Sequence, residues 1–571
     1  MKKRTWATAL IVAALCVVAL ILAGCGGSND TTTTAAGGAT GSTAGAVQTG
    51  GTLSYFIIEP SYIDPYNVSE TQGVAVEHSL FTPLVEYDAV TNEIKPGVAQ
   101  TWEPNADGTV WTFHLTPNTK FHDGTTVTAE NFKYAWERIA DPKNKSDISY
   151  HLSAIKGFDE MQTGKATKLA GVVAKDPNTL EVTLTYPFGD FQYIAGHPSL
   201  GPVPLTAPRL VSDDPKGYES MPVGNGPFKM AEPWKHEQYI KVVKFADYFG
   251  AKPNIDGIDF KIFKDNETAF TEFKAGTIDF TDDIPSGQIA ATKAQYGVSN
   301  QNGGLTANPG NQVINGPELS TYYMWVNNKD QYLKNADLRK AMSLAINRQA
   351  IADAVFEGTR APATGPVPKG IVGYQPNAWP ESTYDVTKAK EFLTKAGYPN
   401  GQGLPTLTMS FNTGSNHEKV FAIIQSDLEK IGIKTKNDPH QWAEYISTFT
   451  KVKDGQWVNP QQVHQLIRLG WVADYPIMDN FLYPLFSTNS GDNKALYSNP
   501  EVDNLIKQAR GIVDPAARIQ AYQAIEKKIG EVMPLVPIVD YTHKGVTSNR
   551  VHNLTYSPLN LADYTSVWLS K

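Results

Sequence analysis

Residues 96–142 read PGVAQTWEPNADGTVWTFHLTPNTKFHDGTTVTAENFKYAWERIADP. Within them, residues 111–115 alternate apolar and polar side chains with a period of two, which predicts a half-buried strand. Residues 129–139 instead repeat their apolar side chains at helical spacing. A strand and an amphipathic helix this close together favour a mixed fold over a β-sandwich or a helical bundle.

The same two patterns alternate along the rest of the chain. Strand patterns recur at residues 180–184, 322–326 and 407–411. Helical spacing recurs at residues 338–355, 386–396, 420–431, 502–510 and 516–532. No internal repeat is visible. We therefore expect helices and strands throughout, in an α/β or α+β arrangement.

Composition excludes several classes of protein. The chain has 571 residues, of which 41% are hydrophobic and 19% charged, so it is neither disordered, collagen-like nor a polytopic membrane protein. Its formal charge of −8 argues against a nucleic-acid partner, because phosphate binding requires clustered Lys and Arg. The two cysteines, Cys16 and Cys25, leave the rest of the chain without disulfides or a Cys-ligated metal.

The N-terminus has the order of a secretory signal. Three basic residues at positions 2–4 precede an apolar run over residues 7–23, which ends at LAGC, residues 22–25. The alternative is a membrane anchor, since the run is only slightly shorter than the roughly 20 residues that span a bilayer. We favour the signal because small residues lead into Cys25 and no stop-transfer charges follow.

The motif LAGC resembles the lipobox of bacterial lipoproteins, in which the Cys is lipidated. The resemblance implies a signal peptide at residues 1–24 and a lipid anchor on Cys25. Residues 25–51 would be the lipidated Cys and a flexible tether, because this segment is rich in Gly, Thr and Ala. We expect an extracytoplasmic protein, lipid-anchored to the bacterial cell membrane.

No catalytic motif is present. His236-Glu237 and His417-Glu418 begin the metalloprotease pattern, but Ile240 and Phe421 stand where the second His is needed. The nucleophile elbow, the phosphate loop and the dinucleotide fingerprint are absent. The paired acids at residues 213–214 and 282–283 are more typical of turns than of a glycosidase. We predict neither an enzyme, nor a cofactor, nor a metal site.

Residues 96–142 are the longest of several motifs that follow one order along the chain. The others lie at residues 63–65, 80–88, 222–228, 273–279, 338–348, 396–399, 470–476 and 497–503. Together they resemble the extracytoplasmic solute-binding proteins of peptide ABC transporters, the oligopeptide- and dipeptide-binding family. Two positions depart from the pattern, since Asn225 stands where Thr is usual and Asn347 where Asp is common.

The resemblance implies an α/β, periplasmic-binding-protein-like fold with two hinged lobes and an extra subdomain inserted in lobe I. Lobe I would comprise residues 52–80, 201–320 and 540–571, the insert residues 81–200, and lobe II residues 321–539. The implied function is to capture short peptides between the lobes and deliver them to the permease of an ABC importer. We expect a monomer.

Asp474 is the principal candidate for the site and stands in the motif GWVADY, residues 470–475. The resemblance implies that its carboxylate pairs with the α-ammonium of the peptide, which loses its water on enclosure. The alternative is a solvated or helix-capping acid. Trp471 and Val472 would line the pocket, where the peptide pairs with the backbone like an added strand, although Trp471 equally suits core packing.

Three further side chains complete the predicted site. Arg468 stands where some tripeptide-preferring relatives hold a ligand carboxylate, and a salt bridge within the protein is the alternative. Tyr322 and Tyr323 resemble aromatic residues of the hinge strand that contact solute, and alternation allows only one of them to face the cleft. Ser69 or Glu70 would lie on the opposite wall, although the spacing there is irregular.

Two other functions stay open at this point. The same scaffold can bind a non-peptide solute such as a metal chelate, a sugar or a modified amino acid. Asp474 favours a ligand with an amine but does not prove one. A surface hydrolase is the third alternative, and it would need a catalytic constellation that the motifs do not supply.

Overall fold

The computed structural model describes residues 47–571, apart from residues 69, 215–216, 414–415, 442–443, 446–449, 451, 454–455, 460–463 and 489. The predicted signal peptide, Cys25, nearly all of the predicted tether and Ser69 lie outside the described residues. Within the described part of the chain, no helix combines the length and the apolar character needed to cross a bilayer.

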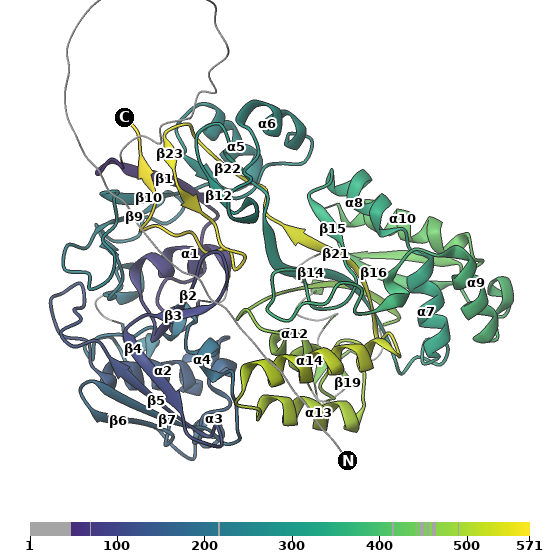
Figure 1. Ribbon diagram of the computed structural model, residues 1–571, viewed down its shortest axis with the longest axis horizontal. Helices are drawn as coiled ribbons and strands as arrows, with labels where there is room; N and C mark the ends of the chain where they lie inside the picture. The colour runs from purple at the N-terminus through teal and green to yellow at the C-terminus, as the bar shows by residue number, and fades with distance from the viewer. Residues whose placement is uncertain are drawn as a thin grey trace, which may run out of the picture. The chain divides into compact units, whose positions relative to one another are not determined.

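A seven-stranded sheet contains both the first strand of the described chain and a strand close to its end (Figure 1). Its order is β13-β22-β11-β1-β10-β9-β8. The strands are β1 (Thr52–Ile57), β8 (Phe228–Met230), β9 (Tyr239–Lys244), β10 (Gly257–Ile262), β11 (Phe280–Thr281), β13 (Val313–Ile314) and β22 (Gly545–Thr547). β1 lies between β10 and β11 and runs parallel to both. Helices α5 (Asn266–Lys274) and α6 (Ile289–Tyr296) pack apolar side chains against Val313 and Val546 of this sheet.

A four-stranded antiparallel sheet of order β4-β5-β7-β6 lies in the segment predicted as the insert. Its strands are β4 (Ala99–Pro104), β5 (Val110–Leu115), β6 (Val172–Asp176) and β7 (Thr179–Thr183). Helix α2 (Ala129–Ala140) begins at a capping box formed by Thr128 and Asn131, and it buries Phe132 and Trp136 against Trp111 and Phe113 of β5. The strand predicted at residues 111–115 and the helix predicted at residues 129–139 are confirmed.

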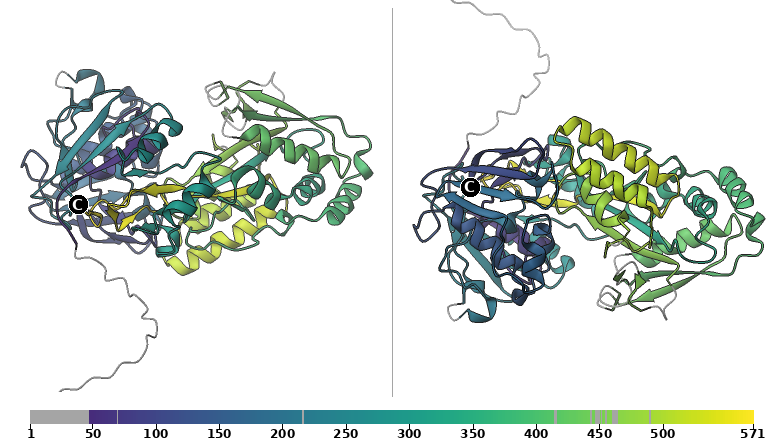
Figure 2. Two further views of the ribbon diagram at one scale, coloured as in Figure 1. Left: turned by 90° about the horizontal axis from the view of Figure 1, so that it is seen from above. Right: turned by 90° about the horizontal axis from the view of Figure 1, so that it is seen from below.

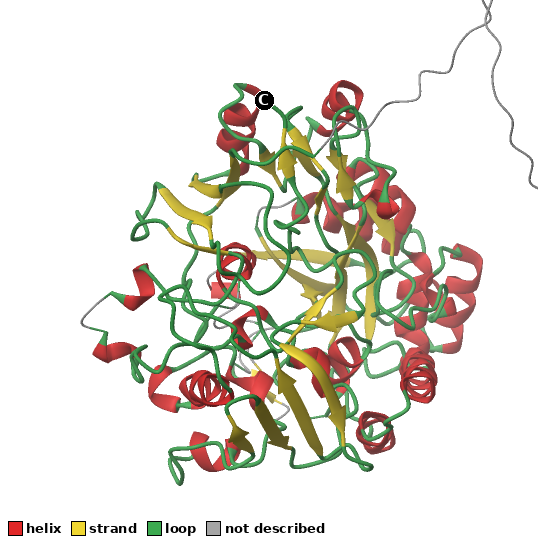
Figure 3. Cartoon of the chain, turned by 60° about the vertical axis from the view of Figure 1, so that its left-hand side comes forward, coloured by secondary structure: helices red, strands yellow, loops and turns green. Residues whose placement is uncertain are grey.

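A six-stranded sheet of order β15-β21-β14-β20-β16-β17 carries the predicted site residues. Its strands are β14 (Pro317–Val326), β15 (Arg360–Pro362), β16 (Leu407–Asn412), β17 (Thr435–His440), β20 (Leu466–Val472) and β21 (Leu535–Thr542). Helices lie on both of its faces, as Figures 1 and 3 show. One face packs against α7 (Ala336–Ala345), α8 (Arg348–Phe356), α9 (Val386–Lys395) and α10 (His417–Glu429), and the other against α12 (Asp479–Phe486), α13 (Pro500–Arg510) and α14 (Pro515–Gly530). Figure 2 shows α13 and α14, the long yellow helices, side by side.

The remaining elements are short. They are α1 (Thr71–Leu80), α3 (Phe158–Gln162) and α4 (Phe191–Ile194), and the paired strands β2 (Val85–Tyr87) with β3 (Ile94–Pro96), β12 (Thr306–Ala307) with β24 (Leu554–Thr555), β18 (Val452–Lys453) with β19 (Gln456–Trp457), and β23 (Val551–His552) with β25 (Trp568–Leu569).

One predicted helix is wrong. The apolar spacing over residues 338–355 predicts a single helix, but the structure has α7 and α8 with a break between them. Ile346 leaves the helical conformation, with φ −83° and ψ 119°, and the side chain of Asn347 accepts a hydrogen bond from the N–H of Ala350. Asn347 therefore ends one helix and caps the next, as short polar side chains do at helix N-termini.

Two short connections join the seven-stranded sheet to the six-stranded sheet. Residues 315–316 lead from β13 to β14, and residues 543–544 lead from β21 to β22. The two connections lie side by side, because the N–H of His543 donates to the carbonyl of Gly316 at 2.9 Å. The two sheets are therefore joined here by a pair of adjacent two-residue crossings.

A candidate ligand-binding site around Asp474

Asn480 holds two of the predicted site residues in place. Asp474 follows the end of β20, and Asn480 lies in the first turn of α12. The Asn480 side chain donates from Nδ2 to Asp474 Oδ2 at 2.9 Å and accepts at Oδ1 from the Asp474 N–H at 3.0 Å. The same Oδ1 accepts from Trp471 Nε1 at 3.0 Å. The predicted site lacks Asn480, because nothing in the sequence marks this side chain as the partner of Asp474.

The Asp474 carboxylate has no cationic partner. It is half-buried, and none of the ion pairs between described residues includes it. Burial raises its pKa, whereas the hydrogen bond from Asn480, nearby His197 and a hydrogen bond from Tyr150 lower it. A half-buried carboxylate held by neutral donors is a suitable partner for a ligand cation.

Two cavities meet at Asp474. The first, which we call the aromatic cavity, has a volume of about 320 Å³ and is lined by Trp471 together with Tyr150 and Tyr483. The second has a volume of about 280 Å³ and is lined by Val472, by Glu70 and by residues near the C-terminus. The structure thus brings Asp474, Trp471 and Val472 to one place.

Glu70 lines the second cavity but already has partners. Its carboxylate caps α1 by accepting from the N–H of Gly73 at 2.9 Å, and it accepts from the N–H of Ser61 at 3.0 Å. These two hydrogen bonds therefore suffice to explain the position of the Glu70 side chain.

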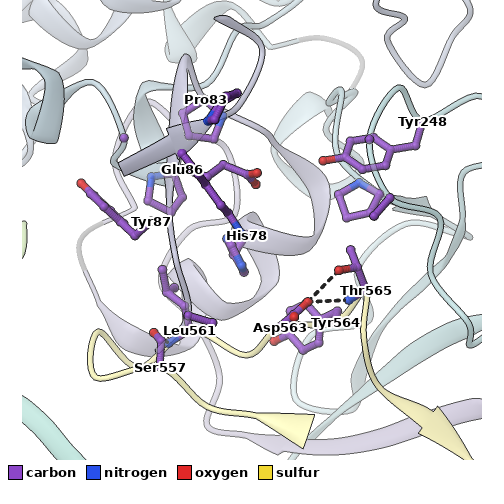
Figure 4. A pocket seen from close by; sticks show the side chains of 18 of the residues that line it. His78, Pro83, Glu86, Tyr87, Tyr248, Ser557, Leu561, Asp563, Tyr564 and Thr565 are labelled. Carbon is purple, nitrogen blue, oxygen red and sulfur yellow. Dashed lines mark hydrogen bonds between the residues drawn. The ribbon is translucent and has the colours of Figure 1, made fainter. Parts of the chain in front are cut away.

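A third cavity adjoins the second and shares Tyr87, Pro198 and Leu561 with it. Its volume is about 280 Å³, and Figure 4 shows His78, Glu86 and Asp563 among its lining side chains. Burial lowers the pKa of His78 to about 4 and raises the pKa of Glu86. Asp563 binds its own loop, because one of its oxygens accepts from the N–H and hydroxyl of Thr565 at 3.0 and 2.7 Å.

The strand that leads to Asp474 has an open backbone edge. β20 pairs with β14 along its whole length, from Leu466 to Val472. On its other side, the register with β16 ends at Ile467. Among the described strands, residues 469–472 therefore pair with β14 alone. An extended peptide can add to such an edge through main-chain hydrogen bonds.

Arg468 is a buried cation without an acidic partner. Its guanidinium lies 4.6 Å from the centroid of the Tyr322 ring and donates to Asn412 Oδ1 at 3.1 Å and to the Tyr541 hydroxyl at 3.3 Å. Its Nε has no hydrogen-bond partner, and no ion pair between described residues includes Arg468. The alternative of a salt bridge within the protein is therefore not found in the described part of the chain.

Arg360 and His417 lie near Arg468, and we call these three side chains the cationic cluster. Arg360 stacks on the Tyr541 ring at 3.5 Å and, like Arg468, takes part in none of the ion pairs between described residues. Burial, and then the charges of Arg468 and Arg360, lower the pKa of His417 to about 3, so this imidazole is neutral. Sequence reasoning missed Arg360 and His417, which come from segments far from Arg468 in the chain.

Tyr322 and Tyr323 lie on opposite faces of β14. Tyr322 packs on the side of α10, where its hydroxyl and His417 Nδ1 are 3.2 Å apart. Tyr323 packs on the side of α12 and α14, with its ring 5.0 Å from that of Trp325. The predicted alternation is confirmed, but neither tyrosine lines the two cavities that meet at Asp474. Tyr322 instead contacts Arg468 and His417.

Within the described residues, no group of three or more His, Cys, Asp or Glu side chains is placed to hold a metal ion.

Comparison with known proteins identifies the family. Residues 93–493 match the model for bacterial extracellular solute-binding proteins, family 5 Middle. The match spans well over half of the chain, and the chain therefore belongs to this family of solute-binding proteins.

Particular relatives agree with this assignment. The glutathione-binding protein GsiB of Escherichia coli K12 is 30% identical over 488 residues, which cover 84% of this chain and 86% of GsiB. The periplasmic murein peptide-binding protein MppA of the same strain is 30% identical over 516 residues, covering 87% and 90% of the two chains. The unliganded open form of MppA superposes with a TM-score of 0.75 at 27% identity, over 92% of this chain and 98% of MppA.

A further similar structure is a complex with a peptide. OppA of Haemophilus influenzae, in complex with RPPGFSPFR, superposes with a TM-score of 0.69 at 26% identity, over 92% of this chain and all of the other. These similarities confirm the predicted fold class, which is α/β and periplasmic-binding-protein-like with two lobes.

Proposed function

We propose that this chain is the substrate-binding subunit of an ABC importer and that it binds short peptides with free amino and carboxyl ends. One observation carries the proposal. Among the residues that the structure describes, Asp474, just beyond the end of β20, is a carboxylate without a cationic partner, and Arg468, near the start of β20, is a buried guanidinium without an anionic one. A zwitterionic peptide supplies the missing partner of each group.

The strand geometry supports an extended peptide between these charges. Arg468 and Asp474 are six positions apart, so their Cα atoms lie at most about 20 Å apart, the length of about six residues of extended chain. The open edge at residues 469–472 lies between the two charges and offers main-chain hydrogen bonds that do not depend on the peptide's side chains. Arg360 and neutral His417 would assist Arg468 in binding the carboxylate.

The relatives support the same class of ligand. MppA is named for murein peptides, GsiB for glutathione, and the OppA structure is a complex with RPPGFSPFR. The alternatives on this scaffold are a non-peptide solute or, in another class, a surface hydrolase.

The accessory features belong to the same proposal. Cys25 would carry the lipid anchor, a membrane permease would receive the solute, and the protein would act as a monomer outside the cytoplasmic membrane. The predicted division into lobe I, insert and lobe II also stays a proposal, with one change. The predicted boundaries after residues 320 and 539 fall inside β14 and β21, so we place the hinge at residues 315–316 and 543–544 instead.

Native mass spectrometry of the purified chain tests the function. We expect co-purified peptides to be released on denaturation and identified by sequence. Release of a non-peptide solute would favour the first alternative. Consumption of an added peptide during incubation would favour the hydrolase and would overturn the proposal.

A further inference from the structure

The aromatic cavity beside Asp474 is formed by two distant parts of the chain. Tyr150 and Tyr186 come from the segment between α2 and α4, whereas Trp471 and Tyr483 come from the end of β20 and from α12. Aromatic side chains therefore line the cavity from both sides. The Arg510 guanidinium already lies over the rings of Tyr483, at 3.5 Å, and Tyr186, at 5.8 Å, so the cavity binds one planar cation of the protein itself. Tyr150 and Trp471 are the aromatic side chains left for a flat or cationic group of a ligand.

The charges that face this cavity are predominantly negative. Asp474 and Asp492 line it, and the one arginine among its lining residues, Arg510, is already neutralised. Arg510 donates to Asp479 from Nε at 2.8 Å and from Nη2 at 2.7 Å.

Asp492 has only a long ion pair. Lys494 Nζ lies 3.7 Å from its Oδ1, and half of the Asp492 side chain is exposed, with a relative accessibility of 51%. The Lys494 side chain is more buried, with a relative accessibility of 15%, but the separation is long for an ion pair, so a closer cation of a ligand can compete with Lys494 for Asp492. Burial has the largest effect on the pKa of Asp492 and raises it. The neighbouring charge of Asp474 also raises this pKa, whereas Lys494 lowers it.

His151 adds an unused hydrogen-bonding group to the wall. Its ring lines the cavity, it is only 2% exposed, and its Nδ1 has no partner among the described residues. The ring lies between Tyr150, at 4.3 Å, and His197, at 4.7 Å. Burial lowers its pKa to about 3, so the ring stays neutral and retains a nitrogen that can accept a hydrogen bond.

We propose that the aromatic cavity receives the first side chain of the bound peptide and that it selects a basic, planar one, the guanidinium of arginine. The inference rests on the proposed peptide-binding function, because it places the α-ammonium at Asp474. A guanidinium stacks on ring faces, donates several hydrogen bonds and carries a positive charge that can approach Asp492 more closely than Lys494 does. A purely aromatic side chain would fill the volume but would leave Asp492 and His151 without donors.

Isothermal titration calorimetry with five peptides tests this selectivity. The peptides share all residues except the first, which is arginine, its neutral isostere citrulline, norleucine, phenylalanine or glutamate. For the wild-type chain we expect the peptide that begins with arginine to bind about tenfold tighter than the peptide that begins with citrulline. The peptide that begins with glutamate should bind most weakly. In Asp492→Asn the ratio of arginine to citrulline should fall to about two, while the affinity for citrulline stays the same.

Asp213→Asn provides the matched control. Asp213 is exposed and lines neither cavity at Asp474, so this variant loses the same charge and should keep the tenfold ratio. Thermal unfolding of both variants checks that they fold.

Every other outcome contradicts either the proposed arginine selectivity or the proposed peptide-binding function. Equal binding of arginine and citrulline to the wild-type chain, tighter binding of phenylalanine than of arginine, or an unchanged ratio in Asp492→Asn would overturn the selectivity and leave peptide binding intact. If none of the five peptides binds more tightly than about 1 mM, the peptide-binding function itself fails.

Discussion

Asp474 is the residue on which the site depends most. Replacing it by Asn keeps the shape of the side chain but removes the charge that faces the ligand ammonium. We expect Asp474→Asn to weaken binding of a peptide with a free amino end by about 100-fold, because an enclosed ammonium is left without a counter-charge. Calorimetry with the free peptide and its N-acetylated form measures this.

The acetylated peptide distinguishes the site from a general loss of structure. It should bind the wild-type chain and Asp474→Asn about equally, since neither complex has the ion pair. Wild-type affinity of Asp474→Asn for the free peptide would contradict the assignment.

Arg468 gives the corresponding prediction for the other end of the ligand. Arg468→Gln should weaken binding of a peptide with a free carboxylate by about 30-fold, because the carboxylate then loses a charge-assisted hydrogen bond in a buried position. A C-terminally amidated peptide should bind both proteins alike. Calorimetry with the two peptides checks this, and an equal loss for both forms would show that Arg468 acts only on the fold.

Parts of the site were predictable from local sequence and parts were not. Asp474, Trp471 and Val472 lie within one short motif, so a resemblance over six residues identifies all of them. Asn480 lies only six positions from Asp474, but the sequence does not show that the turn into α12 brings the two side chains together. Arg360 and His151 belong to distant segments, and His151 lies more than 300 positions from Asp474. Such contacts depend on the tertiary fold, and a single sequence without the structure does not reveal them.

At the scale of elements, β21 carries a buried acid in its second half. Asp540 is 5% exposed, its Oδ1 has no hydrogen-bond partner among the described residues, and burial raises its pKa to about 8. The unfolded chain ionises this carboxyl near pH 4, whereas the folded chain keeps it protonated until about pH 8. Stability is therefore fully present below about pH 4 and is lost as the pH rises to about 8.

Asp540→Asn should remove most of this loss. We expect the variant to equal the wild-type chain in stability near pH 4 and to exceed it by about 1–3 kcal/mol at pH 9, because the amide never has to ionise. Thermal unfolding followed by circular dichroism at several pH values measures the difference. A constant difference across the pH range would contradict the role of ionisation.

The elements also show how far periodicity predicts a fold. Strands at residues 111–115 and 407–411 were predictable, because alternation at a period of two is a local property. The break between α7 and α8 was not, because apolar spacing continues through Ile346 while Asn347 caps the next helix. The position of β1 between β10 and β11 was not predictable either, since its partners lie about 200 residues away.

At the scale of the whole molecule, the segment around Gly189 contacts the helices beside the site. Arg518 of α14 forms an ion pair with Asp190 at 2.6 Å, and both side chains are almost fully buried. The N–H of Gly189 donates to the carbonyl of Arg510 at 2.8 Å, and Arg510 Nη1 donates to the Tyr186 hydroxyl at 3.1 Å. These contacts join the predicted insert to predicted lobe II across the aromatic cavity.

Removing this ion pair should favour the open form. Arg518→Met leaves Asp190 buried without its cation, and we expect peptide affinity to fall about tenfold, because closure must then bury an unpaired charge. Small-angle X-ray scattering with saturating peptide should show a radius of gyration that decreases on binding in the wild-type chain and decreases less in the variant. Equal compaction of both proteins would indicate that the contact has no part in closure.

The open edge of β20 has a consequence for solubility. A strand with unpaired N–H and C=O groups is a template for pairing with any extended chain, including another copy of the same protein. In the proposed binding mode a peptide occupies this edge as a neighbouring strand would. Bound peptide would then protect the protein from edge-to-edge aggregation, and we expect aggregation to be fastest when solute is absent.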